Sequence, residues 1–397
     1  MADRWTRLAE LAVHGANVQE GQVVLVTGEI GHEKMARAVA AAAYDRGAKF
    51  VDVSYFDPWV KRARIEHANP DTITYVPDWY GERMLQHAEM GGARVTIAGP
   101  VAPNALDGVD LTLSGKDMLP RLKELSKIVS DRSTNWCIAP CPNREWAKLV
   151  YPDLDEDAAY EKLWEELEYV LRLDEPDPGK AWDDRMDVLN ESARHLTDRH
   201  FDAIHLSGPG TDLTIGMLPT HRWWAADFQT ASGLRHFPNL PTEETFTTPD
   251  PLRTEGHVTA TKPLVLRDGT IIKGLRVRFE GGVAVEIEAD QNAEALRAQL
   301  SVDDGALRLG ELALVDEAGR IGPLGTVFFE TLLDENAASH IALGSGFPFL
   351  VDPDQVDRTN ESATHVDFMI GSPELDVDGL TADGERVPVL RGGGWQI

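Results

Sequence analysis

The chain has 397 residues, with 38 Lys and Arg against 66 Asp and Glu, and a formal net charge of −28 at pH 7. Its length indicates roughly two or three domains, and 42% hydrophobic residues supply enough apolar side chains for a large core. The acidic excess excludes a protein that grips nucleic acid mainly through phosphates, because that affinity comes from Lys and Arg.

The acidic residues are spread along the whole chain rather than gathered in a tail. Such a charge destabilises the compact state by self-repulsion unless salt screens it. We therefore predict a halophilic protein adapted to a salty cytoplasm. The competing interpretation, an acidic partner-binding segment, requires blocks of like charge that this sequence lacks.

Cys137 and Cys141 are the only cysteines, which excludes a disulfide framework. No second Cys/His pair follows at finger-like spacing, so two buried thiols are favoured over half a zinc site. The sequence has no apolar run long enough to cross a bilayer, and its N-terminus is charged where a signal peptide is apolar. These features predict a soluble, cytoplasmic protein with no membrane partner.

In the first half, short β-branched runs alternate with amphipathic stretches. The predicted strands are 23–27, 50–56, 93–99, 135–140, 201–208 and 211–217. The predicted helices are 32–46, 77–88, 117–131 (with Leu119, Leu122, Leu125 and Ile128 on one face), 155–173 and 182–199. This alternation predicts βαβ units and a largely parallel sheet as far as about Met217.

Helical periodicity nearly disappears after this point. Strand-like segments at 257–266, 271–280 and 283–289 are separated by turns such as Asp268–Thr270, and the tail 375–397 is typical of hairpins. One helix is predicted at 292–300. The prediction is an α/β N-terminal domain with a largely parallel sheet over 1–235, followed by a mostly antiparallel β, or α+β, domain over 236–397.

The glycine-rich segments of the first half do not match nucleotide-binding loops. Gly28 and Gly31 lack the spacing of a dinucleotide-binding turn, and no Gly-Lys-Ser/Thr follows the segment 208–212. Tight turns at strand ends are favoured for both. A nucleotide-using α/β enzyme therefore stays a less favoured alternative.

Carboxylates stand in unusual surroundings in the second half. Glu243 and Glu244 are adjacent in an extended stretch, so they face opposite ways and only one can enter a given site. A pair of solvated surface acids is the simpler interpretation of these two. Glu311 lies inside an apolar run, where a carboxylate is costly unless it is paired with a group such as a buried Arg, hydrogen-bonded, or bound to a metal.

Two histidines accompany these carboxylates. Glu335 and His340 lie in a stretch of small residues that suits a turn entering a short helix. His365 and Asp367 form a His-x-Asp pair, which puts both side chains on one face of a strand. Carboxylates with a few imidazoles suit Zn, Co or Mn, and two-metal hydrolytic sites use such oxygen-rich ligand sets.

Four segments carry a resemblance to a known family: PTEETFTTP, LGELALV, ENAASHIALG and HVDFMIGS. In order and closely in spacing, they resemble the motifs of the M29 family of metallo-aminopeptidases. The resemblance covers the second half, and the first half is similar to the family's α/β domain more loosely. It implies that two divalent ions (Zn, Co or Mn) are bound in the second domain by Glu244, Glu311, Glu335, His340, His365 and Asp367.

The resemblance also implies an activity. Glu311 would bridge the two ions, and Glu244 and Glu335 are the candidates for the catalytic base. The expected enzyme is a metallo-exopeptidase, an aminopeptidase that hydrolyses the N-terminal residue from short peptides. The expected assembly is a homodimer whose active sites open into an enclosed space.

One position departs from the family pattern. Where the family has a Tyr, seven residues after the histidine of the third segment, this chain has Phe347. Phe cannot donate a hydrogen bond to a developing oxyanion, and losing such a donor costs about 10²–10³ in rate. The alternative function is therefore a catalytically impaired relative that binds metal and peptides.

Overall fold

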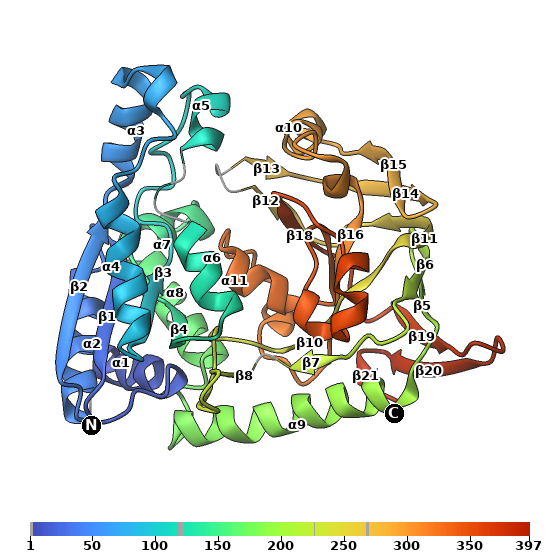
Figure 1. Cartoon of the computed structure of the whole chain (residues 1–397), viewed down its shortest axis with the longest axis horizontal. Helices are drawn as coiled ribbons and strands as arrows, with labels where there is room; N and C mark the ends of the chain where they lie inside the picture. Colours follow the sequence, from blue (N-terminus) through green and yellow to red (C-terminus); the bar gives the residue numbers. More distant parts are fainter. Residues whose placement is uncertain (1–2, 118, 120–122, 226, 267–269) are drawn as a thin grey trace. The chain divides into compact units, whose positions relative to one another are not determined.

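A computed structural model describes residues 3–117, 119, 123–225, 227–266 and 270–397 (Figure 1). The chain divides into two compact units, Met1–Trp182 with Asp227–Pro241, and Asp183–Ala226 with Thr242–Ile397. This division differs from the single boundary predicted at residue 235, because the strands within 203–217 belong to a sheet of the second unit.

The first unit is an α/β structure. Its elements in chain order are α1 (Arg4–Gly15), β1 (Val23–Glu29), α2 (Glu33–Asp45), β2 (Phe50–Phe56), α3 (Pro58–His67), α4 (Asp78–Glu89), β3 (Ala93–Ala98), α5 (Leu111–Lys116), α6 (Lys123–Ser130), β4 (Asn135–Pro140), α7 (Arg144–Val150), α8 (Glu156–Val170), the start of α9 (Pro178–Arg199), β8 (Phe228–Gln229) and β9 (Arg235–His236).

Four strands of this unit form a sheet in the order β2-β1-β3-β4, and every pair is parallel. The small side chains of α2 let this helix pack closely on the sheet, where Val24 and Val26 are fully buried. The parallel sheet predicted for the first half is confirmed in these four strands. Cys137 on β4 and Cys141 just after it are buried free thiols, as predicted.

Two helices of the first half begin several residues away from the predicted start. α9 begins at Pro178 rather than at 182, because Asp177 caps the helix by accepting a hydrogen bond from the backbone N–H of Lys180 (3.0 Å). In the predicted helix 117–131, Asp117 instead accepts a hydrogen bond from the N–H of Leu119 (3.2 Å), a local turn, and α6 begins at Lys123. Leu122 lies outside the described residues.

The second unit is mostly antiparallel, as predicted. Its elements are the rest of α9, β5 (Ala203–Gly208), β6 (Thr211–Met217), β7 (Trp224–Ala225), β10 (Glu244–Thr247), β11 (Pro249–Thr259), β12 (Leu264–Val265), β13 (Ile271–Ile272), β14 (Arg276–Glu280), β15 (Val283–Glu288), α10 (Ala293–Gln299), β16 (Leu309–Val315), α11 (Thr331–Asp334), β17 (His340–Gly344), β18 (His365–Met369), β19 (Asp376–Leu380), β20 (Arg386–Arg391) and β21 (Gly394–Trp395).

Two large antiparallel sheets organise this unit, beside the two-stranded sheet of β12 and β13. One has eight strands in the order β15-β14-β11-β6-β5-β19-β20-β21, and the other has five in the order β18-β17-β16-β10-β7. β11 also packs against β16, so the two sheets meet there. The hairpins predicted in the tail are confirmed by β19, β20 and β21. The predicted turn Asp268–Thr270 falls largely outside the described residues.

The prediction that parallel pairing extends to Met217 is wrong. β5 and β6 pair with each other antiparallel and lie inside the eight-stranded sheet. Only Pro209 and Gly210 connect the two strands, and Gly210 has a φ of +71°. A connection this short can join only antiparallel neighbours, because parallel strands need a long crossover.

Charged residues recur along α9, so this helix is not an apolar segment. Within the described ranges, none of the helices has the combination of length and apolar character that spanning a membrane requires.

Candidate metal centre

The five-stranded sheet brings five of the six predicted site residues onto one face. Glu244 on β10 lies opposite Val315 on β16, and His340 on β17 lies opposite Ala313. Because alternate residues of a strand share a face, Glu311 points to the same side as Val315 and Ala313. The sequence spacing alone does not show this, since it does not give the register between strands.

The register of β18 completes the group. Ala342 on β17 lies between Glu311 on one side and Asp367 on the other, and Gly344 lies opposite His365. The small side chains of Ala313, Ala342 and Gly344 therefore alternate with the acids and histidines and leave room between them. The opposite face of these strands carries buried leucines, Ile341 and Phe368, which anchor the sheet in the core.

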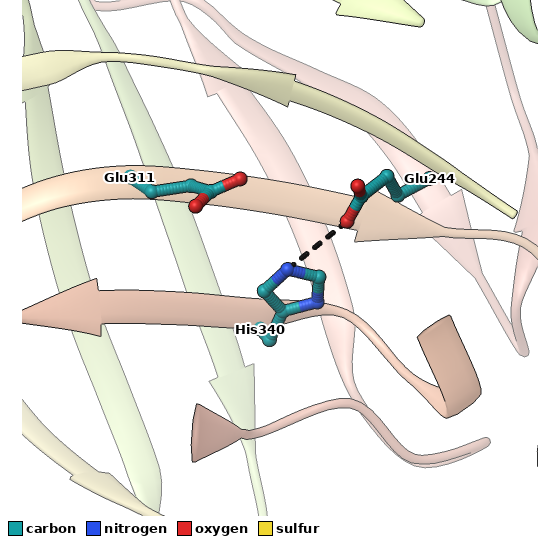
Figure 2. A group of neighbouring side chains, drawn as sticks. All are labelled: Glu244, Glu311 and His340. Carbon is teal, nitrogen blue, oxygen red and sulfur yellow. Dashed lines mark ion pairs between the residues drawn. The ribbon is translucent and has the colours of Figure 1, made fainter. Parts of the chain in front are cut away.

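Glu244, Glu311 and His340 form the first ligand group (Figure 2). One potential ligand atom from each residue lies within 4.8 Å of the others, and all three residues are buried. His340 Nε2 lies 3.1 Å from Glu244 Oε2. These three predicted ligands thus come from three different strands, β10, β16 and β17.

Glu311, His365 and Asp367 form the second ligand group. His365 Nε2 lies 3.0 Å from Glu311 Oε2 and 3.0 Å from Asp367 Oδ1. The predicted placement of His365 and Asp367 on one face of a strand is therefore observed. Glu311 belongs to both groups, so its carboxylate could contribute to either one. The partner of Glu311 is a histidine rather than the Arg considered as an alternative.

Backbone carbonyls orient both imidazoles. His340 Nδ1 lies 3.1 Å from the carbonyl oxygen of Ala338, and His365 Nδ1 lies 2.8 Å from that of Ser345. A carbonyl oxygen can only accept, so each Nδ1 carries the proton and donates it. Both Nε2 atoms therefore face the carboxylates, and this arrangement is the usual one around metal-bound histidines.

The acids hold protons on these imidazoles in the absence of an ion. Burial opposes the charged form of His340, but Glu244 and Glu311 outweigh it and raise its pKa to about 10. Burial likewise opposes protonation of His365, yet Asp367 and Glu311 raise its pKa well above the ordinary value. Metal ligation requires neutral imidazoles, so an ion that binds here displaces protons.

The donor set fits divalent cations. Burial raises the pKa of Glu311, and the nearby Asp367 adds to this effect. Glu244 Oε2 is buried, and the group that lies against it is another member of the same ligand group, His340 Nε2 at 3.1 Å. Carboxylates crowded at such short distances repel one another unless cations lie between them. Three oxygen ligands and two imidazoles therefore match a carboxylate-rich metal centre.

Glu335 lies outside both ligand groups. It begins the short 3₁₀-helix η4 (Glu335–Ala337) after α11 and is half-buried. Burial raises its pKa well above the ordinary value, and the charges of Asp367 and Glu244 raise it further. The carboxylates of the candidate metal centre are thus close enough to affect the pKa of Glu335, but Glu335 belongs to neither ligand group.

The sequence did not predict the role of three residues near the centre. Glu243, interpreted as a surface acid, is fully buried and forms an ion pair with Arg185, which also binds Asp316. Arg185 and Asp316 stand in none of the motif segments, whereas Glu243 stands in PTEETFTTP beside Glu244, and this was the available signal for it.

Phe347 lies directly beside the candidate metal centre. Its ring centroid is 5.7 Å from that of His365 and 5.1 Å from that of Phe246. The position that departs from the family pattern is therefore next to the second ligand group.

Comparisons with known proteins identify relatives of the whole chain. Residues 1–395 match the family described as thermophilic metalloprotease (M29). Aminopeptidase T of Thermus aquaticus is 41% identical, with 98% of both chains covered, and aminopeptidase PepS of Streptococcus thermophilus is 36% identical, with 98% of this chain and 96% of the relative covered. The solved structure of wild-type AmpT from Thermus thermophilus superposes with a TM-score of 0.92 at 39% identity, over 99% of each chain.

Proposed function

Because the chain belongs to the M29 metallopeptidase family, and is therefore a metallo-exopeptidase, we propose that it removes the N-terminal residue of short peptides with the help of two divalent ions. The observation that carries this proposal is that Glu311 is shared by two ligand groups. The curated relatives named above are aminopeptidases, which supports the same reaction. Membership of this family over 1–395 leaves the nucleotide-using alternative without support.

In this proposal Glu244, Glu311 and His340 would hold one ion, and Glu311, His365 and Asp367 would hold the other. Zn, Co and Mn all suit this ligand set, and availability in the cell decides among them. Such ions lower the pKa of water and polarise the scissile carbonyl. The buried acids also provide a negative site for the free α-amino group, which would select exopeptidase substrates.

Glu335 is the candidate acid–base residue. It is close to the centre but outside both ligand groups, and burial raises its pKa toward the range in which a carboxyl group both accepts and returns a proton. Its role would be to take a proton from the attacking water and deliver it to the leaving amine. Glu244, the other candidate, is already engaged with His340.

A chelation experiment tests the activity. We expect the purified protein to hydrolyse leucine p-nitroanilide at high salt, to lose this activity on chelation, and to regain it with Zn, Co or Mn. An N-acetylated leucine anilide is the matched control, because it lacks the free amine and should not be cleaved. Equal cleavage of both substrates, or activity unaffected by chelation, would contradict the proposal.

A second candidate function, a catalytically impaired metal- and peptide-binding relative, is favoured by Phe347. We expect Phe347→Tyr to change kcat for the anilide by less than about tenfold, because the ions already polarise the carbonyl. A gain of about 10²–10³, the usual worth of an oxyanion donor, would instead show that the native site is impaired. Phe349→Tyr, in the neighbouring aromatic contact, is the control.

We also propose that the protein is a cytoplasmic, halophilic homodimer. The net charge of −28 supports halophily. We expect the melting temperature to rise by roughly 10 °C or more between about 0.1 M and 1 M KCl, because the screening length falls from about 10 Å to 3 Å. Differential scanning fluorimetry measures this, and a melting temperature indifferent to molar KCl would refute halophily. Light scattering would test the dimer.

A further inference from the structure

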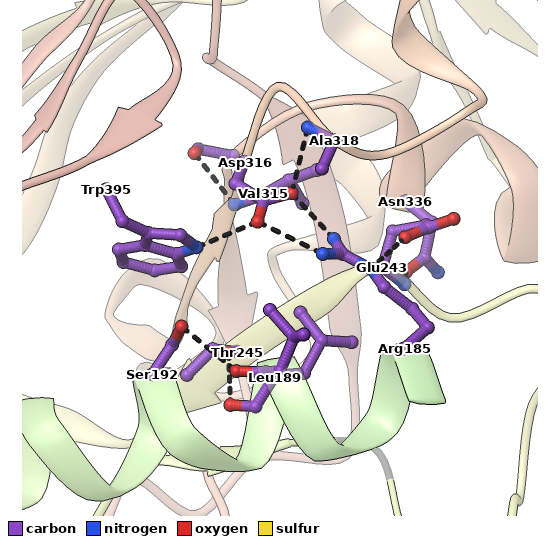
Figure 3. Close-up of polar contacts among 12 residues, drawn as sticks. Arg185, Leu189, Ser192, Glu243, Thr245, Val315, Asp316, Ala318, Asn336 and Trp395 are labelled. Atoms are coloured by element: carbon purple, nitrogen blue, oxygen red, sulfur yellow. Dashed lines mark hydrogen bonds and ion pairs between the residues drawn. The ribbon is translucent and has the colours of Figure 1, made fainter. Parts of the chain in front are cut away.

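Arg185 on α9 is the centre of a buried charged cluster in the second unit (Figure 3). Its Nε donates to Glu243 Oε2 (2.6 Å), while Nη1 and Nη2 donate to Asp316 Oδ2 (3.1 Å) and Oδ1 (2.6 Å). The three residues are 7%, 0% and 8% exposed. One planar guanidinium thus holds two carboxylates from different segments in a fixed geometry.

Each of these carboxylates adjoins a segment that carries a site residue. Glu243 directly precedes Glu244, which begins β10. Asp316 directly follows β16, the strand of Glu311. Since Glu244 pairs in register with Val315, the fork of Arg185 joins the residue that precedes β10 to the residue that follows β16.

The cluster extends to the segment that carries Glu335. The backbone N–H of Glu243 donates to Asn336 Oδ1 (2.7 Å), and Asn336 directly follows Glu335. The side chain of Asn336 in turn donates to the carbonyl of Leu332 (3.0 Å). These buried bonds hold η4 against the start of β10.

Asp316 is held by further donors. Trp395 Nε1 donates to Asp316 Oδ2 (2.8 Å), and the backbone N–H of Ala318 donates to Oδ1 (3.2 Å). With two bonds from Arg185, both oxygens of this carboxylate have several partners. Such a saturated carboxylate has little freedom to move, so it is a firm attachment point for Arg185.

We propose that Arg185 is a positioning residue of the metal centre, an inference that rests on the proposed function. The guanidinium of Arg185, by binding both Glu243 and Asp316, sets the spacing between Glu244 and Glu311. It touches neither the ligand atoms nor a substrate in this role. Partners that orient metal ligands typically contribute about 10–100-fold to metal affinity. Arg185 should therefore act on ion binding more than on the chemical step.

The test uses Arg185→Lys in the full chain, loaded with Co²⁺. Lys keeps the charge but cannot engage both carboxylates as a planar fork. We expect the Co²⁺ affinity, measured by chelator competition, to fall about 10–100-fold and the visible spectrum of bound Co²⁺ to change. Excess Co²⁺ should restore most of kcat, with KM little changed.

Two further variants make the result decisive. Arg391→Lys is the matched control, because Arg391 pairs with the buried Asp378 in the eight-stranded sheet of the same unit, and it should leave Co²⁺ affinity unchanged. Trp395→Phe removes one hydrogen bond to Asp316 and should lower the Co²⁺ affinity to a smaller degree. If Arg185→Lys does not fold, Trp395→Phe is the variant that tests the positioning role.

Native affinity and spectrum in folded Arg185→Lys, or in Trp395→Phe where only that variant folds, would overturn the positioning role. An equal loss in Arg391→Lys would also overturn it, since general destabilisation would then explain the effect. Failure of the native chain itself to bind two ions would refute the metal centre instead, so the two failures are distinguishable.

Discussion

Glu311→Ala is expected to abolish binding of both ions and to reduce anilide hydrolysis to background. The reason is that Glu311 alone belongs to both ligand groups, so its removal takes one oxygen ligand from each ion and the bridge between them. The remaining groups, Glu244 with His340 and His365 with Asp367, supply only two protein ligands each. Metal content after gel filtration, together with the anilide assay, measures this.

His340→Ala is the companion variant, because it removes a ligand from the first group only. Asp378→Asn is the control for loss of a buried carboxylate, since Asp378 is buried and paired with Arg391 in the other sheet of the same unit. The control should retain both ions. Retention of two ions per chain in Glu311→Ala would refute the shared-carboxylate arrangement.

Glu335→Gln is expected to lower kcat by about 10²–10⁴, the usual worth of a positioned acid–base residue, while both ions stay bound. The amide has nearly the shape of the carboxyl group but cannot accept or return a proton. Because Glu335 lies outside both ligand groups, the metal content should not change. Steady-state kinetics with metal analysis on the same sample measures both quantities.

The matched variant for this prediction is Glu244→Gln. Glu244 contacts His340 within the first ligand group, so its substitution should reduce metal content as well as rate. If Glu335→Gln also lost an ion, Glu335 would be a ligand, as the family resemblance implies, and its role as the acid–base residue would be contradicted.

The sequence predicted the first unit well because its strands carry strong local signals. β2 coincides with the predicted 50–56, and the apolar β-branched run 23–27 lies within β1. The same local alternation failed at β5 and β6, where the helix α9 precedes a hairpin rather than another parallel strand. Strand direction there is decided by the two-residue turn at Pro209 and Gly210, which the alternation of elements does not reveal.

The candidate site was predictable to different degrees for different residues. His365 and Asp367 share a face by strand geometry alone, so their proximity followed from the sequence. The meeting of Glu244, Glu311 and His340 depends on the register of three strands, which no local pattern contains. The pairing of Glu243 with Arg185 joins residues far apart in the chain, and for this reason the sequence suggested a surface acid instead.

The acidic excess of the chain therefore contains two kinds of carboxylate. Most acids are dispersed along the sequence, and the proposed halophily would account for them. Glu244, Glu311 and Asp367 are instead gathered with two histidines on one face of a sheet.

The central claim, that two ions share Glu311, is tested most directly by anomalous diffraction from crystals grown with Zn²⁺ or Mn²⁺. Two anomalous peaks are expected, about 3.5–4 Å apart. One should lie among Glu244, Glu311 and His340, and the other among Glu311, His365 and Asp367. A single peak, or two peaks of which one lies away from Glu311, would contradict it.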